Sequence, residues 1–169
     1  MNNKNTVIFD LDGTLALIDS RRELSIKDNG KLDWDTFFNP KMITLDDPNL
    51  PVIKMAQMFH NDGFRVVIFS GRNDRSFHAT VSWLKTNDVP HDLLVMRPDK
   101  FKDKSWPIAD GNPATSDMRF MPDNILKKKM LDTFLDINDI FLVVDDRNRV
   151  VDMWRSLGLS VFQVAPGDF

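Results

Sequence analysis

The sequence predicts an α/β fold with a mainly parallel sheet of about five strands flanked by helices. Two observations predict it. Short apolar, β-branched runs alternate with segments whose apolar residues recur at helical spacing. The chain has 169 residues, enough for one domain with a core of its own. Strands that alternate with helices imply right-handed crossovers between parallel strands. Ligands of such sheets bind beyond the carboxyl ends of the strands, so polar residues in those positions are the candidates for function.

The expected strands are apolar runs that end in polar residues. The first, at residues 6–9, is apolar on both faces, as a central strand should be. Four further strands are expected at residues 64–69, 93–96, 140–144 and 160–164.

The helices are expected between these strands. Pro51 suits the first turn of one helix, and Gly158 is a natural stop after another. The spacing of apolar residues predicts helices at residues 51–60, 74–87, 123–135 and 149–157.

Two long segments interrupt the alternation and are expected to be insertions in a single domain of residues 1–169. Long connections are usually functional covers or disordered segments. Residues 19–49 contain Trp34, and residues 98–122 contain Trp106. Such aromatics favour folded covers, a small cap insertion at 19–49 and a second cover loop at 98–122. We expect both tryptophans to anchor the covers to the core, a reading preferred to stacking on a base.

Composition excludes several classes of function. Hydrophobic residues make up 42% and charged residues 28%, as in soluble globular proteins. The net charge of −3 provides no global basic field for nucleic acid, so any such contact must be local. The absence of cysteine excludes disulfides, thiolate zinc sites and a cysteine nucleophile. Without a signal segment or a long apolar run, we expect an intracellular, cytoplasmic protein that does not bind membranes.

The first candidate motif is Asp10-Leu11-Asp12-Gly13-Thr14, directly after the first strand. Two carboxylates one residue apart can face the same pocket, and Gly13 lets the chain turn closely around a ligand. A carboxylate that attacks phosphorus forms a phosphoaspartate, so Asp10 is the expected nucleophile. Asp12 is expected to protonate the leaving oxygen and then activate water, with neighbouring carboxylates raising its pKa.

Two more polar clusters follow later strands. Ser70-Gly71-Arg72 offers a hydroxyl, a backbone amide and a guanidinium to phosphate oxygens. Asp145-Asp146-Arg147 offers the hard oxygen ligands that magnesium prefers. With Asp10 and Asp12 it would gather four carboxylates at one point, which requires a cation. Lys127 can supply a second positive charge. Each cluster alone could be a turn or a helix cap, but their shared place at strand ends favours one site.

These motifs together resemble the haloacid dehalogenase superfamily of phosphotransferases, over the whole chain and in the expected order. The resemblance implies Asp10 as nucleophile and Asp12 as acid and base. It implies Ser70 and Lys127 as phosphate ligands. It also implies Mg²⁺ held by Asp10, the Asp12 carbonyl and Asp145, with Asp146 in support.

A narrower resemblance is to the 3′-phosphatase domain of the phage polynucleotide kinase-phosphatase, which removes phosphate from the 3′ end of DNA or RNA. It is carried by Ser70-Gly71-Arg72, Asp145-Asp146-Arg147, residues 150–155 and residues 163–169. It implies a cytoplasmic location, for which the cytoplasm of a phage-infected bacterial host is one setting. By position it implies that Arg21 and Arg72 contact the substrate phosphate and that Asp123 is a further essential acid. The expected substrate-binding residues are thus Thr14, Arg21, Ser70, Gly71, Arg72, Asp123 and Lys127, and the expected metal ligands are Asp10, Asp12, Asp145 and Asp146.

Three functions remain open on the sequence. The first is a polynucleotide 3′-phosphatase, for which Arg21, Arg22, Lys27 and Lys31 could line a groove. The second is a small-molecule phosphatase acting on nucleoside monophosphates. The third is a non-enzymatic binding module, against which the intact acidic motif argues. No kinase-type P-loop and no obligate protein partner are evident. The two cover segments depart from the family pattern, and they border the substrate entrance.

Overall fold

A computed structural model of the chain describes residues 4–98 and 118–168. The second cover loop expected at residues 98–122 therefore lies largely outside the described residues, as does Trp106. Among the helices of the described ranges, none is long and apolar enough to cross a membrane.

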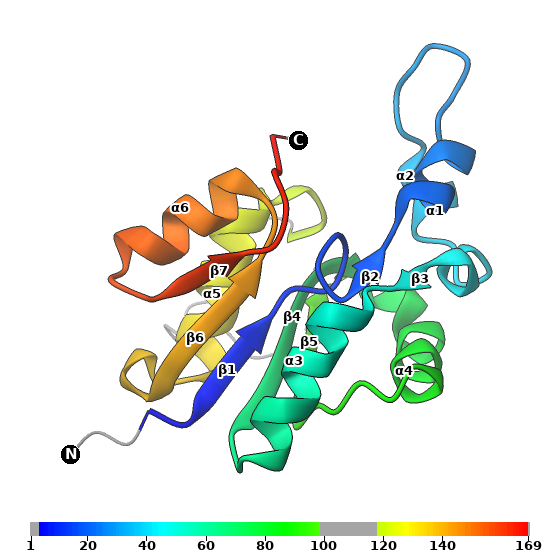
Figure 1. The fold of residues 1–169 in the computed structure, drawn as a ribbon. Coiled ribbons are helices and arrows are strands. Elements are labelled where there is room, and N and C mark those ends of the chain that lie inside the picture. The colour runs from blue at the N-terminus through cyan, green and yellow to red at the C-terminus, as the bar shows by residue number, and fades with distance from the viewer. Residues whose placement is uncertain (1–3, 99–117, 169) are drawn as a thin grey trace.

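A five-stranded parallel sheet forms the centre of the molecule (Figure 1). Its strands run in the order β5-β4-β1-β6-β7, so that β1 lies in the middle. β1 is paired on both sides and its residues are fully buried, as an apolar strand without alternation requires. The strands are β1 (Thr6–Phe9), β4 (Arg65–Asn73), β5 (Leu93–Arg97), β6 (Ile140–Asp145) and β7 (Val161–Gln163).

Four main helices cover the two faces of this sheet. α3 and α4 pack on the face that carries Val7 and Phe9, whereas α5 and α6 pack on the face that carries Ile8. Alternate residues of β1 therefore feed two separate cores, one on each side of the sheet. The helices are α3 (Leu50–Asn61), α4 (Phe77–Thr86), α5 (Asp123–Phe134) and α6 (Asn148–Ser156).

Residues 19–49 fold into short elements between the two strands of a small antiparallel sheet. β2 (Ala16–Leu17) pairs with β3 (Asp47–Pro48), which brings the two ends of the segment together. Figure 1 shows the segment rising beyond β2 and β3, away from the main sheet. Its elements are α1 (Asp19–Leu24), α2 (Trp34–Phe37) and the 3₁₀ turn η1 (Met42–Leu45).

The elements differ from the sequence expectation mainly at the end of β4. This strand continues to Asn73, and its pairing with β5 becomes irregular between Ser70 and Asn73. Ser70-Gly71-Arg72 is therefore the irregular end of a strand, not a loop after it. The helix expected from residue 74 begins as a 3₁₀ turn, and the remaining short turns are η2 (Asp74–Ser76), η4 (Met118–Phe120) and η5 (Ile137–Asp139).

Candidate active site

The chain turns sharply directly after β1. The backbone N–H of Asp10 still donates to the Val144 carbonyl at 2.9 Å, which keeps Asp10 at the end of the sheet. Gly13 then adopts a φ of +88°, a conformation that strains other residues. A Cβ at Gly13 would also collide with the Asp146 carboxylate. The sequence needs glycine here for both reasons, and the turn brings the loop against Asp146.

Three buried carboxylates meet at this end of the sheet. Asp10, Asp145 and Asp146 each offer an oxygen, and these oxygens lie within 4.8 Å of one another. Burial and the two neighbouring carboxylates raise the pKa of Asp10 well above its usual value, against the effect of Lys127. Burial and Asp145 likewise raise the pKa of Asp146. Three hard oxygen donors at this spacing fit a Mg²⁺ ion, which would relieve their repulsion.

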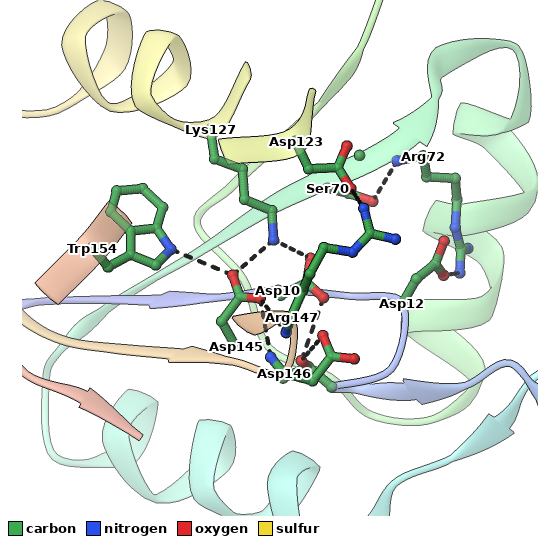
Figure 2. A network of polar contacts seen from close by, with 12 residues as sticks. Asp10, Asp12, Ser70, Arg72, Asp123, Lys127, Asp145, Asp146, Arg147 and Trp154 are labelled. Carbon is green, nitrogen blue, oxygen red and sulfur yellow. Dashed lines mark hydrogen bonds and ion pairs between the residues drawn. The ribbon is translucent and has the colours of Figure 1, made fainter. Parts of the chain in front are cut away.

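Lys127 reaches the same group from α5. Its side chain is 3% exposed, and its Nζ donates to Asp10 Oδ1 at 2.6 Å and to Asp145 Oδ2 at 2.8 Å. These carboxylates outweigh burial and raise the pKa of Lys127, so it is an ammonium. Trp154 Nε1 also donates to Asp145 Oδ2, at 3.4 Å (Figure 2). Thr14 Oγ1 donates to Asp10 Oδ2 at 3.3 Å and lies 3.4 Å from Asp146 Oδ1.

The Asp12 carboxylate does not join this acidic group. It accepts hydrogen bonds from Arg21, at 2.6 Å, and from Arg72. Burial raises the pKa of Asp12, but the Arg72 and Arg21 guanidiniums outweigh it and lower the pKa to about 2. Two expectations are therefore corrected: three carboxylates converge instead of four, and the pKa of Asp12 is lowered instead of raised. Neighbouring arginines, not neighbouring carboxylates, surround it.

A second carboxylate, Asp46, completes this arginine cluster. Arg21 Nε donates to Asp46 Oδ1 at 2.8 Å, and Arg72 Nη2 donates to Asp46 Oδ2 at 2.9 Å. All three side chains are fully buried. Burial raises the pKa of Asp46 to about 6, although both arginines act in the opposite direction. The sequence motifs did not point to Asp46, because it lies in the long segment between recognisable elements.

Ser70 and Gly71 line the end of β4 next to the acidic group. Ser70 is fully buried, and its Oγ accepts the backbone N–H of Arg72 at 3.1 Å. A Cβ on Gly71 would lie 2.7 Å from Asp123 Oδ1, so glycine is what permits Asp123 to approach.

Asp123, at the start of α5, is held by two arginines. Arg97 donates to its Oδ1 and Arg147 donates to its Oδ2. Arg97 also donates to the Gly71 carbonyl at 2.9 Å, which links the ends of β4 and β5. Neither arginine was among the expected site residues. Arg97 is the last residue of β5, so the strand-end rule that selected the other clusters also points to it.

Apart from Ser70, the expected site residues separate into three neighbouring groups, which Asp46, Arg97 and Arg147 join. Figure 2 shows Asp123 and Ser70 beside the Lys127 ammonium, with Arg72 and Asp12 on the far side of Ser70. The acidic group contains Asp10, Thr14, Lys127, Asp145 and Asp146; the arginine cluster contains Asp12, Arg21, Asp46 and Arg72; the third group contains Gly71, Arg97, Asp123 and Arg147.

Trp34 does not anchor residues 19–49 to the core as expected. It is 57% exposed, and it stacks on Phe38 with ring centroids 5.7 Å apart. The buried aromatic of the segment is Phe37, whose ring lies 4.2 Å from the Arg21 guanidinium carbon. Trp34 therefore presents an exposed ring next to Phe37, the residue that packs against Arg21 of the arginine cluster.

Comparison with known proteins identifies the family. The family model for the polynucleotide kinase PNKP phosphatase domain matches residues 4–169. A chain of the Pnkp1/Rnl/Hen1 RNA repair complex is 32% identical with a TM-score of 0.69, and the alignment covers 97% of this chain and 43% of that one. A second structure of the Pnkp1/Rnl/Hen1 complex gives 30% identity, a TM-score of 0.70, and coverage of 98% and 47%. This chain thus spans less than half the length of these two relatives.

More distant structures share the fold. A putative phosphatase from Clostridium difficile is 15% identical with a TM-score of 0.61, over 95% of this chain and 85% of that one. The parallel sheet with helices on both faces is accordingly the Rossmann-like fold of haloacid dehalogenase hydrolases. The chain belongs to the family of PNKP phosphatase domains within the haloacid dehalogenase superfamily, and it is a phosphatase.

Proposed function

We propose that this chain is a Mg²⁺-dependent polynucleotide 3′-phosphatase that works through a phosphoaspartate at Asp10. The observation that carries the proposal is the set of charges around Asp10: a carboxylate at the end of β1, bonded by the Lys127 ammonium, beside two further acidic residues. The match to the PNKP phosphatase family over residues 4–169 supports the same chemistry.

In the first step, an Asp10 carboxylate oxygen attacks the phosphorus of a phosphomonoester. The bond from phosphorus to the leaving oxygen breaks, and that oxygen takes a proton from Asp12, which can carry one in this step if the phosphate oxygens engage the two guanidiniums that otherwise hold Asp12 ionised. Lys127 and the Ser70 hydroxyl bind the phosphoryl oxygens and stabilise the negative charge that develops on them. Lys127 is already fixed within reach of Asp10, so little reorganisation is needed.

In the second step, water attacks the phosphorus and the bond to Asp10 breaks. Asp12 takes the proton from that water, which releases inorganic phosphate and restores the Asp10 carboxylate. The two arginines favour the carboxylate form of Asp12, which is the form that this step uses.

Asp10, Asp145 and Asp146 would supply the carboxylates that hold Mg²⁺, and the Asp12 carbonyl would be the further ligand. When bound, Mg²⁺ neutralises the phosphate and orients it towards Asp10. The acidic group carries three carboxylates against the single Lys127 ammonium, so a divalent cation balances the excess negative charge.

Two observations favour a polynucleotide end as substrate. The most similar structures named above come from an RNA repair complex. The exposed Trp34 ring contacts Phe37, which packs on Arg21, and it offers a surface on which a base can stack. We propose that residues 19–49 act as a small cap that contributes this ring to the substrate entrance.

A substrate panel with Mg²⁺ tests the proposal. It contains a 3′-phosphorylated oligonucleotide, the matching 5′-phosphorylated oligonucleotide, and 3′- and 5′-mononucleotides, each in ribose and deoxyribose form. We expect phosphate release to be fastest from the 3′-phosphorylated oligonucleotide. Equal rates on 3′ and 5′ ends would contradict the end specificity, and a preference for mononucleotides would indicate a nucleotidase.

The nucleophile is tested separately by Asp10→Asn. This variant should lose turnover on every substrate, whereas the exposed control Asp152→Asn on α6 should keep it. Full turnover by Asp10→Asn would refute the phosphoaspartate mechanism.

A further inference from the structure

Residues 164–168, which follow β7 and are called the brace here, pack against the loop between β6 and α6. The backbone N–H of Val164 donates to the Asp145 carbonyl at 3.1 Å. Further along, the backbone N–H of Asn148 donates to the Gly167 carbonyl at 2.9 Å. Figure 1 shows the brace in red, running past the start of α6. The loop that carries Asp146 is therefore covered by a second piece of main chain.

Gly167 is the point at which the brace comes closest to this loop. A Cβ at Gly167 would collide with the Asp146 carbonyl oxygen and would lie 2.6 Å from Arg147 Cα. Both are main-chain atoms, which cannot swing aside as the end of a flexible side chain can. The φ of Gly167 is not in the left-handed region, so its own backbone conformation does not call for glycine. Glycine is needed here for its close contact with the peptide between Asp146 and Arg147.

Asn148, the first residue of α6, ties the brace to the loop from the other side. Its Oδ1 accepts Gln163 Nε2 at 2.6 Å and the Gly167 backbone N–H at 3.3 Å. Its Nδ2 donates to Asp168 Oδ1. The side chain of Asn148 thus bonds the residue before the brace and the last two residues of it, which keeps Gly167 against the loop.

The peptide under Gly167 carries two side chains that serve different groups of the site. The Asp146 carboxylate belongs to the acidic group, whereas the Arg147 guanidinium donates to Asp123. If this peptide moved, both side chains would move with it. The oxygens of the acidic group lie within 4.8 Å of one another, so a small shift of Asp146 changes how well they converge.

We propose that Gly167 and Asn148 are positioning residues that hold the Asp146 carboxylate in place for Mg²⁺. This inference rests on the proposed function, in which Asp146 is one of the residues that hold the ion. Gly167 has no side chain to offer a ligand, and Asn148 bonds the brace and its neighbour Gln163. Both act through the main chain of the Asp146 loop, as groups that orient metal ligands do.

The test is calorimetric titration of Mg²⁺ into the metal-free protein. For Gly167→Ala we expect the Mg²⁺ dissociation constant to rise about 10-fold to 100-fold, because the new Cβ pushes the Asp146 peptide away. The matched control is Gly158→Ala, where φ is +79° and nothing lies within 4 Å of the added Cβ. This control should lose stability through backbone strain and still bind Mg²⁺ as the wild type does. A merely structural role of Gly167 would give the same pattern as the control.

A second variant keeps the inference testable if Gly167→Ala does not fold. Asn148→Ala removes three side-chain hydrogen bonds to the brace and to Gln163 without adding an atom. We expect the Mg²⁺ dissociation constant to rise about threefold to tenfold. Its control is Asn138→Ala, which removes an exposed side-chain bond to Asp136 before β6 and should leave Mg²⁺ binding unchanged. Thermal unfolding in EDTA identifies the variants that fold.

The outcomes separate this inference from the proposed function. Wild-type Mg²⁺ affinity in a folded Gly167→Ala protein would overturn the inference; if that variant does not fold, the same result in Asn148→Ala would do so. Either result leaves the proposed function standing, provided that the wild-type protein is active on the panel. If the wild-type protein bound Mg²⁺ but released phosphate from no substrate, the proposed function would fail, and the titrations would still decide the inference. A wild-type protein that bound no Mg²⁺ would refute both.

Discussion

Asp10 and Asp12 lie two residues apart, but their carboxylates have opposite surroundings. Burial and two further acidic residues raise the pKa of Asp10, whereas two arginines lower the pKa of Asp12 to about 2. Their side chains contact different groups: Asp10 pairs with Lys127 in the acidic group, whereas Asp12 pairs with the arginine cluster. Attack on phosphorus needs the ionised form of Asp10, which the Lys127 ammonium favours and a bound Mg²⁺ would favour further.

At the scale of single residues, Lys127 is the cation whose removal should lower activity and stability most. Lys127→Met leaves the Asp10 and Asp145 charges buried without their partner. We expect kcat to fall by about 10²–10³ and the free energy of unfolding in EDTA to fall by about 3–5 kcal/mol. Initial rates and denaturant unfolding measure the two effects. Lys128→Met is the control, since Lys128 pairs with the exposed Asp132 on the surface of α5; a loss of similar size there would contradict a specific role.

A second residue-scale prediction separates backbone strain from contact with the acidic group. Gly13 and Gly30 both have positive φ, +88° and +75°, but a Cβ at Gly13 would collide with Asp146 whereas nothing lies within 4 Å at Gly30. Both alanine variants should lose about 1 kcal/mol of stability from the left-handed backbone. Gly13→Ala should also lose at least about tenfold in kcat, because the Asp146 carboxylate must move. Unfolding curves measure the loss of stability, and initial rates measure the loss of kcat. Equal activity of both variants would show that the close approach of Gly13 to Asp146 is unimportant for catalysis.

At the scale of elements, the sequence predicted the parts that periodicity and strand ends determine. All five main strands and four main helices lie where apolar spacing placed them, to within a few residues at their ends. The three polar clusters meet because the carboxyl ends of β1, β4 and β6 lie side by side in the sheet.

The sequence could not predict which charges pair within the site. Asp46 follows only the short 3₁₀ turn η1, and its pairing with Arg21 and Arg72 depends on how residues 19–49 return to the core. The exposure of Trp34 and the burial of Phe37 likewise depend on the rotation of a single helical turn, α2, which is too short to show periodicity.

One element-scale prediction concerns the end of β7. Gln163 Nε2 donates to the Asp146 carbonyl at 2.9 Å and to Asn148 Oδ1 at 2.6 Å, so β7 supports the loop that carries the acidic residues. Gln163→Leu should raise the Mg²⁺ concentration needed for half-maximal activity by about threefold to tenfold, since groups that orient metal ligands affect metal affinity. Activity at varied Mg²⁺ measures this. Gln57→Leu on α3, which removes a hydrogen bond to the Asp88 carbonyl, should leave the Mg²⁺ requirement unchanged, and a matching shift there would contradict the prediction.

At the scale of the whole molecule, the acidic group exists only in the folded chain. Its contacts join residues far apart in sequence: Thr14 bonds Asp146 across 132 positions, and Lys127 bonds Asp10 across 117. A ligand that binds these groups together therefore binds the native state and not the unfolded chain. Such a ligand must stabilise the fold, and the effect depends on its concentration.

Mg²⁺ should accordingly raise the melting temperature of the protein. At a concentration about 100 times its dissociation constant, a ligand of the native state adds about 2.7 kcal/mol, which for a domain of this size corresponds to roughly 5–10 °C. Thermal unfolding in EDTA and in Mg²⁺ measures the shift. Asp145→Asn removes one of the three carboxylates and should abolish most of it, whereas the exposed Asp152→Asn should retain it. The difference between the two temperatures is compared within each variant, so any loss of stability caused by the substitution itself cancels. A full shift in Asp145→Asn would place the stabilising Mg²⁺ elsewhere than in the acidic group.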